Sequence, residues 1–172
     1  GSPVTAMIWP HDQPIVLGLA DGKVRAANVK SNKSSTIYNA DSYVVSLASN
    51  VSGKGFVSGH ADGTIVRYFF DDEGSGDTQG KCVTHSCPPY ALSWAGPTVI
   101  AAGCDKRIYA YSRDGRVLQQ FDFSRDDDEK EFTVAVCNPS GQSVVVGSFN
   151  RLRLLNWSPR KGLWEEGKSK DL

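Results

Sequence analysis

Short apolar runs alternate with polar, turn-forming residues along the chain. The first repeat shows this pattern most clearly, with apolar runs at Val4–Trp9, Pro14–Leu19, Lys23–Val29 and Ser34–Tyr38. Runs of this length, bounded by Gly, Pro, Asn and Asp, are typical of β-strands. No window shows the 3.6-residue period of an amphipathic helix, and apolar stretches of about five residues are far shorter than the roughly 20 that a membrane helix needs. The pattern therefore predicts an all-β fold.

The same layout occurs four times. In each repeat a glycine follows a short apolar run and begins a tight polar turn before the next run, at Gly18, Gly59, Gly103 and Gly147. These glycines are 41, 44 and 44 residues apart, which is the period of WD-type propeller blades. The first strand of each repeat carries a small residue, as the narrow inner edge of a blade requires: Ala6, Ser46, Ala91 and Ala135. We therefore predict a WD40-type β-propeller fragment of four four-stranded blades.

The repeats set the expected domain boundaries. Blades are predicted at residues 3–39, 40–86, 87–126 and 127–167, with a tail at 168–172 and a tag remnant at Gly1 and Ser2. Two acidic insertions, at residues 71–80 and 125–131, are interpreted as solvated loops. Four blades are fewer than most propellers of this class need to close. We expect the apolar faces of the end blades to pair with a second copy, with a strained four-blade ring as the alternative.

The turns between the second and third strands carry the strongest local signal. Asp21-Gly22 and Asp62-Gly63 are typical of two-residue hairpins, in which glycine accepts the positive φ of a primed turn. The third and fourth repeats have Asp105-Lys106 and Phe149-Asn150 at this place. Their turns are therefore degenerate, and a lysine tolerates the left-handed region less readily than an asparagine does.

Composition and motifs disfavour several classes of function. Nineteen basic residues balance nineteen acidic ones, so nothing favours nucleic acid or an anionic membrane as partner. The phosphate-binding glycine motifs of nucleotide sites do not occur, and no Gly-x-Ser-x-Gly elbow accompanies the three histidines. We expect no cofactor and no catalytic activity. The four cysteines are interpreted as reduced thiols, and a zinc site at Cys82, His85 and Cys87 is the less favoured alternative because it offers three ligands only.

Several stretches carry a more specific resemblance, above all residues 58–76, and also residues 18–28, 33–38, 43–47, 88–92 and 101–105. They resemble the large WD-repeat subunits of intraflagellar transport complex B, and the chain is similar to the C-terminal half of the first propeller of such a subunit. The resemblance implies a non-enzymatic scaffold needed for ciliary assembly and for transport along the axoneme. It implies other transport subunits or ciliary cargo as partners, and a location at the cilium and ciliary base on the cytoplasmic side. The alternative is a generic WD-repeat adaptor from another cytosolic pathway.

The resemblance also suggests individual roles. His85 corresponds to the histidine of a WD Gly-His pair, which implies a hydrogen bond to Asp105 as a structural tie. Near the end of the chain, Arg151, Arg153, Arg160 and Lys161 form a basic group close to two tryptophans. This group is interpreted as charge that protects an edge strand from aggregation, and a phospholipid or acidic-protein site is the alternative.

Overall fold

The computed structural model describes residues 1–71, 74 and 76–172, which form seventeen β-strands and no helix. The described residues accordingly include no helix long and apolar enough to cross a membrane. The strands form four separate antiparallel sheets, each built from consecutive strands of the chain. The expectation of an all-β fold with four four-stranded sheets is confirmed.

The first two sheets take up the N-terminal half. The first contains β1 (Val4–Ile8), β2 (Ile15–Leu19), β3 (Lys23–Asn28) and β4 (Lys33–Asn39). The second contains β5 (Val44–Ser49), β6 (Gly55–His60), β7 (Thr64–Phe69) and β8 (Thr78–Thr84). Because β8 begins at Thr78, residues 78–80 belong to a strand and not to the loop predicted at 71–80; residues 72, 73 and 75 of that loop lie outside the described residues.

The last two sheets repeat this arrangement with one addition. The third contains β9 (Ala91–Ala95), β10 (Thr98–Ala102), β11 (Arg107–Ser112) and β12 (Val117–Asp122). The fourth contains β13 (Val134–Cys137), β14 (Ser143–Ser148), β15 (Arg151–Ser158) and β16 (Leu163–Glu166). A short strand, β17 (Lys170–Asp171), pairs with the start of β15, so the predicted tail extends the fourth sheet.

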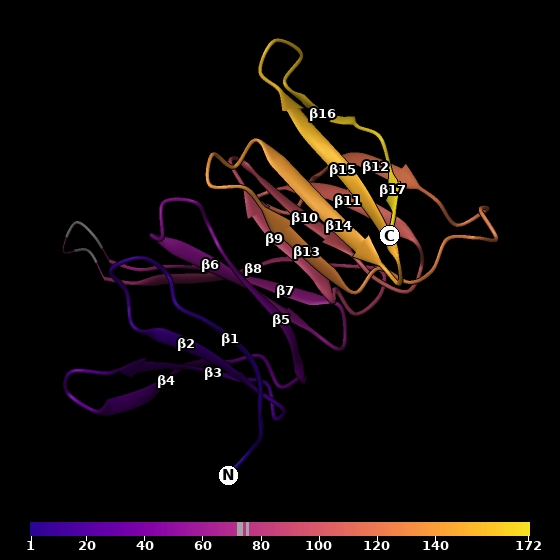
Figure 1. Cartoon of the computed structure of the whole chain (residues 1–172). Helices are drawn as coiled ribbons and strands as arrows, with labels where there is room; N and C mark the ends of the chain where they lie inside the picture. The colour runs from indigo at the N-terminus through magenta and orange to yellow at the C-terminus, as the bar shows by residue number, and fades with distance from the viewer. Residues whose placement is uncertain (72–73, 75) are drawn as a thin grey trace.

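The sheets follow one another in an open arc, with the first and the fourth at its two ends (Figure 1). Successive sheets pack through their first strands, β1 against β5, β5 against β9, and β9 against β13. Each junction encloses one apolar cluster, centred on Phe56, Trp94 and Trp164 in turn. The arc is open, so the four-blade ring that we considered as an alternative is not the form of this structure.

Candidate functional site

The β2–β3 and β6–β7 turns are hydrogen-bonded to the segments that lead from their own sheet into the next one. In the first, the Gly22 amide donates to the Leu19 carbonyl at 3.1 Å, and the Asp21 carboxylate accepts from the Lys23 amide at 3.0 Å. Gly22 has a φ of 94°, whereas Asp21 is not among the residues with positive φ. Glycine therefore stands directly after the two central residues of the turn, Ala20 and Asp21. The prediction that Asp21 and Gly22 are themselves the central residues of a primed turn is wrong.

Gly63 shows why this position needs a glycine. Its φ is 91°, and a Cβ atom there would lie 2.2 Å from the carbonyl oxygen of His85. The Gly63 carbonyl in turn accepts from the His85 amide at 2.8 Å. Asp62 fixes the turn by accepting from the Thr64 amide at 2.9 Å. The turn thus anchors the segment that leads from β8 into the third sheet.

The His85 ring, in the segment after β8, packs against β11 of the third sheet. Its Nδ1 lies 2.7 Å from the Tyr111 hydroxyl, and the ring meets Tyr109 and Tyr111 edge-on with centroid distances of 5.2 and 5.8 Å. Burial lowers the pKa of His85, although the nearby Asp105 charge opposes this effect. The ring is therefore a neutral, tightly packed side chain.

The expected hydrogen bond between His85 and Asp105 is not present. His85 Nε2 is buried and has no hydrogen-bond partner within the described part of the chain. Asp105 instead accepts from the Ser86 hydroxyl at 2.6 Å and from the Arg107 amide at 3.2 Å. Ser86, one residue further along, thus makes the predicted tie to the β10–β11 turn.

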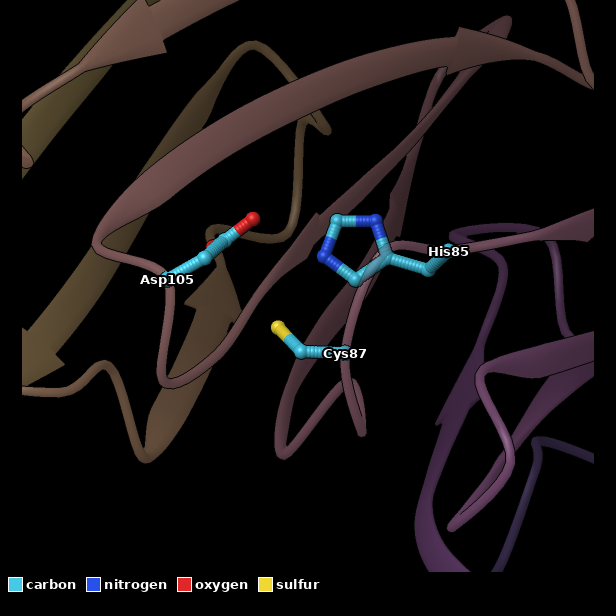
Figure 2. A group of neighbouring side chains, drawn as sticks. All are labelled: His85, Cys87 and Asp105. Atoms are coloured by element: carbon cyan, nitrogen blue, oxygen red, sulfur yellow. The ribbon is translucent and has the colours of Figure 1, made fainter.

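Asp105 and His85 nevertheless lie close together, and Cys87 lies beside them (Figure 2). One potential ligand atom from each residue falls within 4.8 Å of the other two. Burial raises the pKa of the Cys87 thiol to about 11, with smaller effects from Asp105 and the neighbouring Cys104 thiol. The Cys82 thiol donates instead to the carbonyl oxygens of Ser112 and Arg113. The structure therefore places Asp105 beside His85 and Cys87. Cys82, the third zinc ligand considered from the sequence, lies elsewhere.

A second buried polar chain joins the first and second sheets. The Tyr38 hydroxyl donates to Ser58 Oγ at 2.7 Å, Ser58 Oγ lies 2.8 Å from His60 Nε2, and His60 Nδ1 lies 2.7 Å from the Ser42 carbonyl. A carbonyl only accepts, so Nδ1 carries the proton and Nε2 accepts from Ser58. Burial lowers the pKa of His60 more than the bond to Ser42 raises it. The sequence did not predict this series of hydrogen bonds, because the residues lie on β4, on β6 and in the loop between β4 and β5.

Glu129, in the segment between β12 and β13, is bonded to the fourth sheet. Its side chain is fully buried and accepts from Ser148 Oγ at 2.9 Å, Arg151 at 2.9 Å and Arg153 at 2.6 Å. Burial raises the pKa of Glu129, but these hydrogen bonds outweigh burial, and the pKa is lowered overall. The Arg153 guanidinium also lies 4.0 Å from the centre of the Phe123 ring. A buried carboxylate with two guanidinium partners is a structural ion-pair cluster.

This cluster corrects two sequence interpretations. Residues 125–131 are not simply a solvated loop, because Glu129 lies inside the protein. Arg151 and Arg153 retain only 21% and 12% exposure, and both are engaged in ion pairs. They are therefore neither an exposed edge charge nor a free contact surface. Arg160 and Lys161 are exposed, Lys161 pairs with Glu165 at 2.7 Å, and a role for these two in partner contact stays a prediction.

The turns of the third and fourth sheets border a shared groove. It consists of two adjoining hollows that share Glu131 and Thr133, and we call them together the turn groove. Their other lining residues include Tyr90, Cys104, Lys106, Lys130 and Phe149. Phe149, in the β14–β15 turn, is 86% exposed, and its φ is 47°. A non-glycine residue in the left-handed region costs roughly 1–2 kcal/mol. An aromatic side chain that is both strained and exposed does not serve the folded core, which makes the turn groove a candidate contact surface.

Comparisons with known proteins place this geometry in context. No family model matches the chain. The chain is 66% identical over 171 residues to "Intraflagellar transport protein 172 homolog" of Danio rerio, and 65% identical over 171 residues to the protein of the same name in Rattus norvegicus. Both alignments cover 99% of this chain and 10% of the relative. The chain matches one segment of intraflagellar transport protein 172. It spans about one tenth of the length of these curated relatives.

The structural comparison identifies the fold. A chain of the mitotic checkpoint complex superposes with a TM-score of 0.74 at 19% identity, covering 99% of this chain and 51% of that chain. At this identity the likeness shows the fold alone, and the fold is that of a WD40 propeller. The prediction of a WD40-type partial propeller is confirmed, as is the resemblance to intraflagellar transport protein 172.

Proposed function

We propose that this chain is part of a non-enzymatic protein-interaction scaffold, a propeller segment of an intraflagellar transport complex B subunit. Its role is to support ciliary assembly and transport along the axoneme, at the cilium and ciliary base on the cytoplasmic side. The observation that carries the proposal is the identity of 64–66% to vertebrate relatives across 99% of the chain. Repeat folds of this kind act mainly as extended binding surfaces.

The turn groove is the part of the surface that we assign to docking, and its occupant is another subunit of the transport complex. Phe149 offers an exposed aromatic anchor, and aromatic anchors carry much of the energy of protein interfaces. Lys106, Lys130 and Glu131 lie beside it, which gives the groove the polar rim typical of such contacts.

The histidines support a binding role over a catalytic one. Of the described residues, His60 and His85 are buried and fixed by neighbouring elements. His11 is exposed and lies 3.3 Å from Asp12 in an irregular segment. A general base has to reach its substrate, and neither buried ring borders the turn groove.

Crosslinking mass spectrometry on intact complex B tests the docking proposal. Amine-reactive crosslinks from Lys106 and Lys130 to one other subunit are expected. Phe149→Ala, introduced into the full-length subunit, should reduce these crosslinks and weaken retention of that subunit about tenfold. Val117→Ala is the matched control, because Val117 is 51% exposed on the outer strand β12. Crosslinks confined to the same subunit, or equal effects of the two variants, would refute the docking site.

We also propose that the isolated chain pairs with a second copy through the two open faces of the arc. Ala6 and Ile8 of β1 pack toward the second sheet, so Met7 between them faces away, and it is 65% exposed. At the other end, Val134 and Val136 of β13 are 62% and 65% exposed. Exposed apolar faces of this kind mark interfaces.

Light scattering of the chain over a dilution series tests the pairing. A dimer that dissociates on dilution is expected, and Met7→Lys combined with Val136→Lys should give a monomer at every concentration. Substitution of Val117 by Lys, away from the open faces, should leave the dimer unchanged. A monodisperse monomer of the unsubstituted chain would overturn the pairing while leaving the docking proposal intact.

A further inference from the structure

His85 has a feature that the packing of the protein does not explain. The residue is only 2% exposed, yet Nε2 has no hydrogen-bond partner in the described residues. Buried polar atoms are almost always satisfied, because an unmet hydrogen bond costs about 1–3 kcal/mol. Figure 2 shows the ring edge that carries this nitrogen turned toward Asp105 and Cys87. The atom is therefore buried, unpartnered and directed at two further ligand groups.

The other side of the ring is arranged as a metal-binding imidazole requires. If Nε2 keeps its lone pair free, Nδ1 carries the proton and donates to the Tyr111 hydroxyl, which lies 2.7 Å away. Metal-bound histidines commonly donate their second ring nitrogen to such a partner, which fixes the tautomer and the ring orientation. The edge-on contacts with Tyr109 and Tyr111 fix the orientation further.

The two remaining groups suit the same ion. The Cys87 thiol and the Asp105 carboxylate lie within 4.8 Å of each other and of the His85 ring nitrogen. Bonds of about 2.0–2.3 Å in a tetrahedral site place ligand atoms roughly 3.5 Å apart. Closing the difference needs a contraction of up to about 1.3 Å. The half-buried Cys87 and Asp105 side chains have to rotate toward His85, and Asp105 does so by exchanging its hydrogen bond from Ser86 for the ion. Ser86 and Cys104, the sequence neighbours of these ligand groups, are exposed, so the cluster lies close to the surface.

We propose that His85 Nε2, Cys87 Sγ and an Asp105 carboxylate oxygen bind one Zn²⁺ ion, with water in the fourth position. Sulfur, imidazole and carboxylate together match zinc better than calcium or magnesium, which take oxygen ligands. Cys87 gives up its thiol proton to solvent on binding. The ion joins the segment after β8 to the β10–β11 turn, and so links the second and third sheets.

Cys82 and Cys104 stand outside the ligand set for different reasons. Cys82 is buried and directed at the carbonyl oxygens of Ser112 and Arg113. Cys104 is adjacent to the cluster but exposed, and it does not belong to the group of mutually close ligand atoms. Its substitution therefore distinguishes a water from a second thiolate in the fourth position.

Zinc binding to the reduced chain is measured by competition with a chromogenic chelator, with Zn²⁺ as the only metal. One ion per chain is expected, together with a zinc-dependent rise in the unfolding temperature. His85→Gln, Cys87→Ser and Asp105→Asn should each weaken binding about tenfold or more. Cys104→Ser and the distant Cys137→Ser should leave the affinity within about twofold.

A spectroscopic measurement on the unsubstituted chain guards against variants that fail to fold. The Co²⁺-loaded chain should show a thiolate-to-metal charge-transfer band of the strength of one sulfur ligand, and Cys104→Ser should not change it. Absence of stoichiometric zinc binding by the folded chain would overturn the proposal. Binding that persists in Asp105→Asn but is lost in Cys104→Ser would overturn the ligand set, and two-sulfur band strength would do the same.

Discussion

Replacing Glu129 by Gln tests whether the ion-pair cluster holds the fourth sheet in place. The substitution keeps the size of the side chain and removes its charge. The Arg151 and Arg153 guanidinium groups, which bond to Glu129 at 2.9 and 2.6 Å, then lose their buried partner. Since removal of one member of a buried ion pair leaves an uncompensated charge, the variant should be strongly destabilised.

The structure sets the size of the effect. Breaking a buried pair costs about 3–5 kcal/mol. The lower end applies here, because Arg151 keeps Asp171 at 2.8 Å and Arg153 keeps Glu166 at 3.4 Å. A loss of about 3 kcal/mol in a chain of this size lowers the unfolding temperature by roughly 6–12 °C, and it lowers the urea midpoint by about 1–1.5 M.

Urea and thermal unfolding, followed by tryptophan fluorescence and circular dichroism, measure this loss. Asp127→Asn is the matched control, since it removes a negative charge from the same segment at an exposed position and should cost less than about 0.5 kcal/mol. The lowered pKa of Glu129 adds a pH signature. The unfolded state binds the proton more tightly, so the stabilisation is present above the ordinary carboxyl pKa and is lost as pH falls through the lower folded value. Equal stability of the two variants at pH 7 would refute the reasoning.

The remaining predictions concern the turns and the histidines. Gly63→Ala should destabilise the chain by about 3 kcal/mol, because a Cβ atom meets the His85 carbonyl, whereas Gly162→Ala, with open space around it, should cost about 1 kcal/mol in urea unfolding. Phe149→Gly should stabilise by about 0.5–1 kcal/mol by relieving left-handed strain while reducing docking in the crosslinking assay; unchanged stability would contradict the strain argument. Burial lowers the pKa of His60 and of His85, so stability measured by urea titration should fall as pH drops below about 6.5, down to the lower folded pKa values.

The strands were predictable because each one repeats a local signal. Alternating apolar residues between Asp, Gly and Asn turns fix where strands begin and end, and the observed β2, Ile15–Leu19, differs from the predicted run by one residue. The propeller arrangement followed from the spacing of the repeats. Strand β17 was missed, since Lys170 and Asp171 carry no apolar signal, and their pairing with Arg151 and Leu152 is set by the neighbouring strand.

The buried polar contacts were harder to predict from the sequence than the strands were. Glu129 stands in a run of charged residues, and that run indicates a solvated loop unless its partners are known. Those partners lie 19 to 24 residues further along the chain, on β14 and β15, and no local pattern marks the pairing. The same holds for His85, for which resemblance suggested Asp105, whereas Nδ1 meets Tyr111.

The three junctions between sheets show why spacing predicts geometry better than chemistry. Polar side chains are buried near each junction and need partners, because a buried, unpaired group is costly. The first uses Tyr38 and His60 through Ser58, and the second places His85 against Tyr111. At the third, Glu129 in the segment between β12 and β13 forms ion pairs with two arginines of β15. The polar residues near the junctions thus differ in type and in strand position, although the spacing of the repeats is regular. Only the second junction keeps an unpartnered nitrogen beside a thiol and a carboxylate, so among these ties it is the one suited to a metal ion.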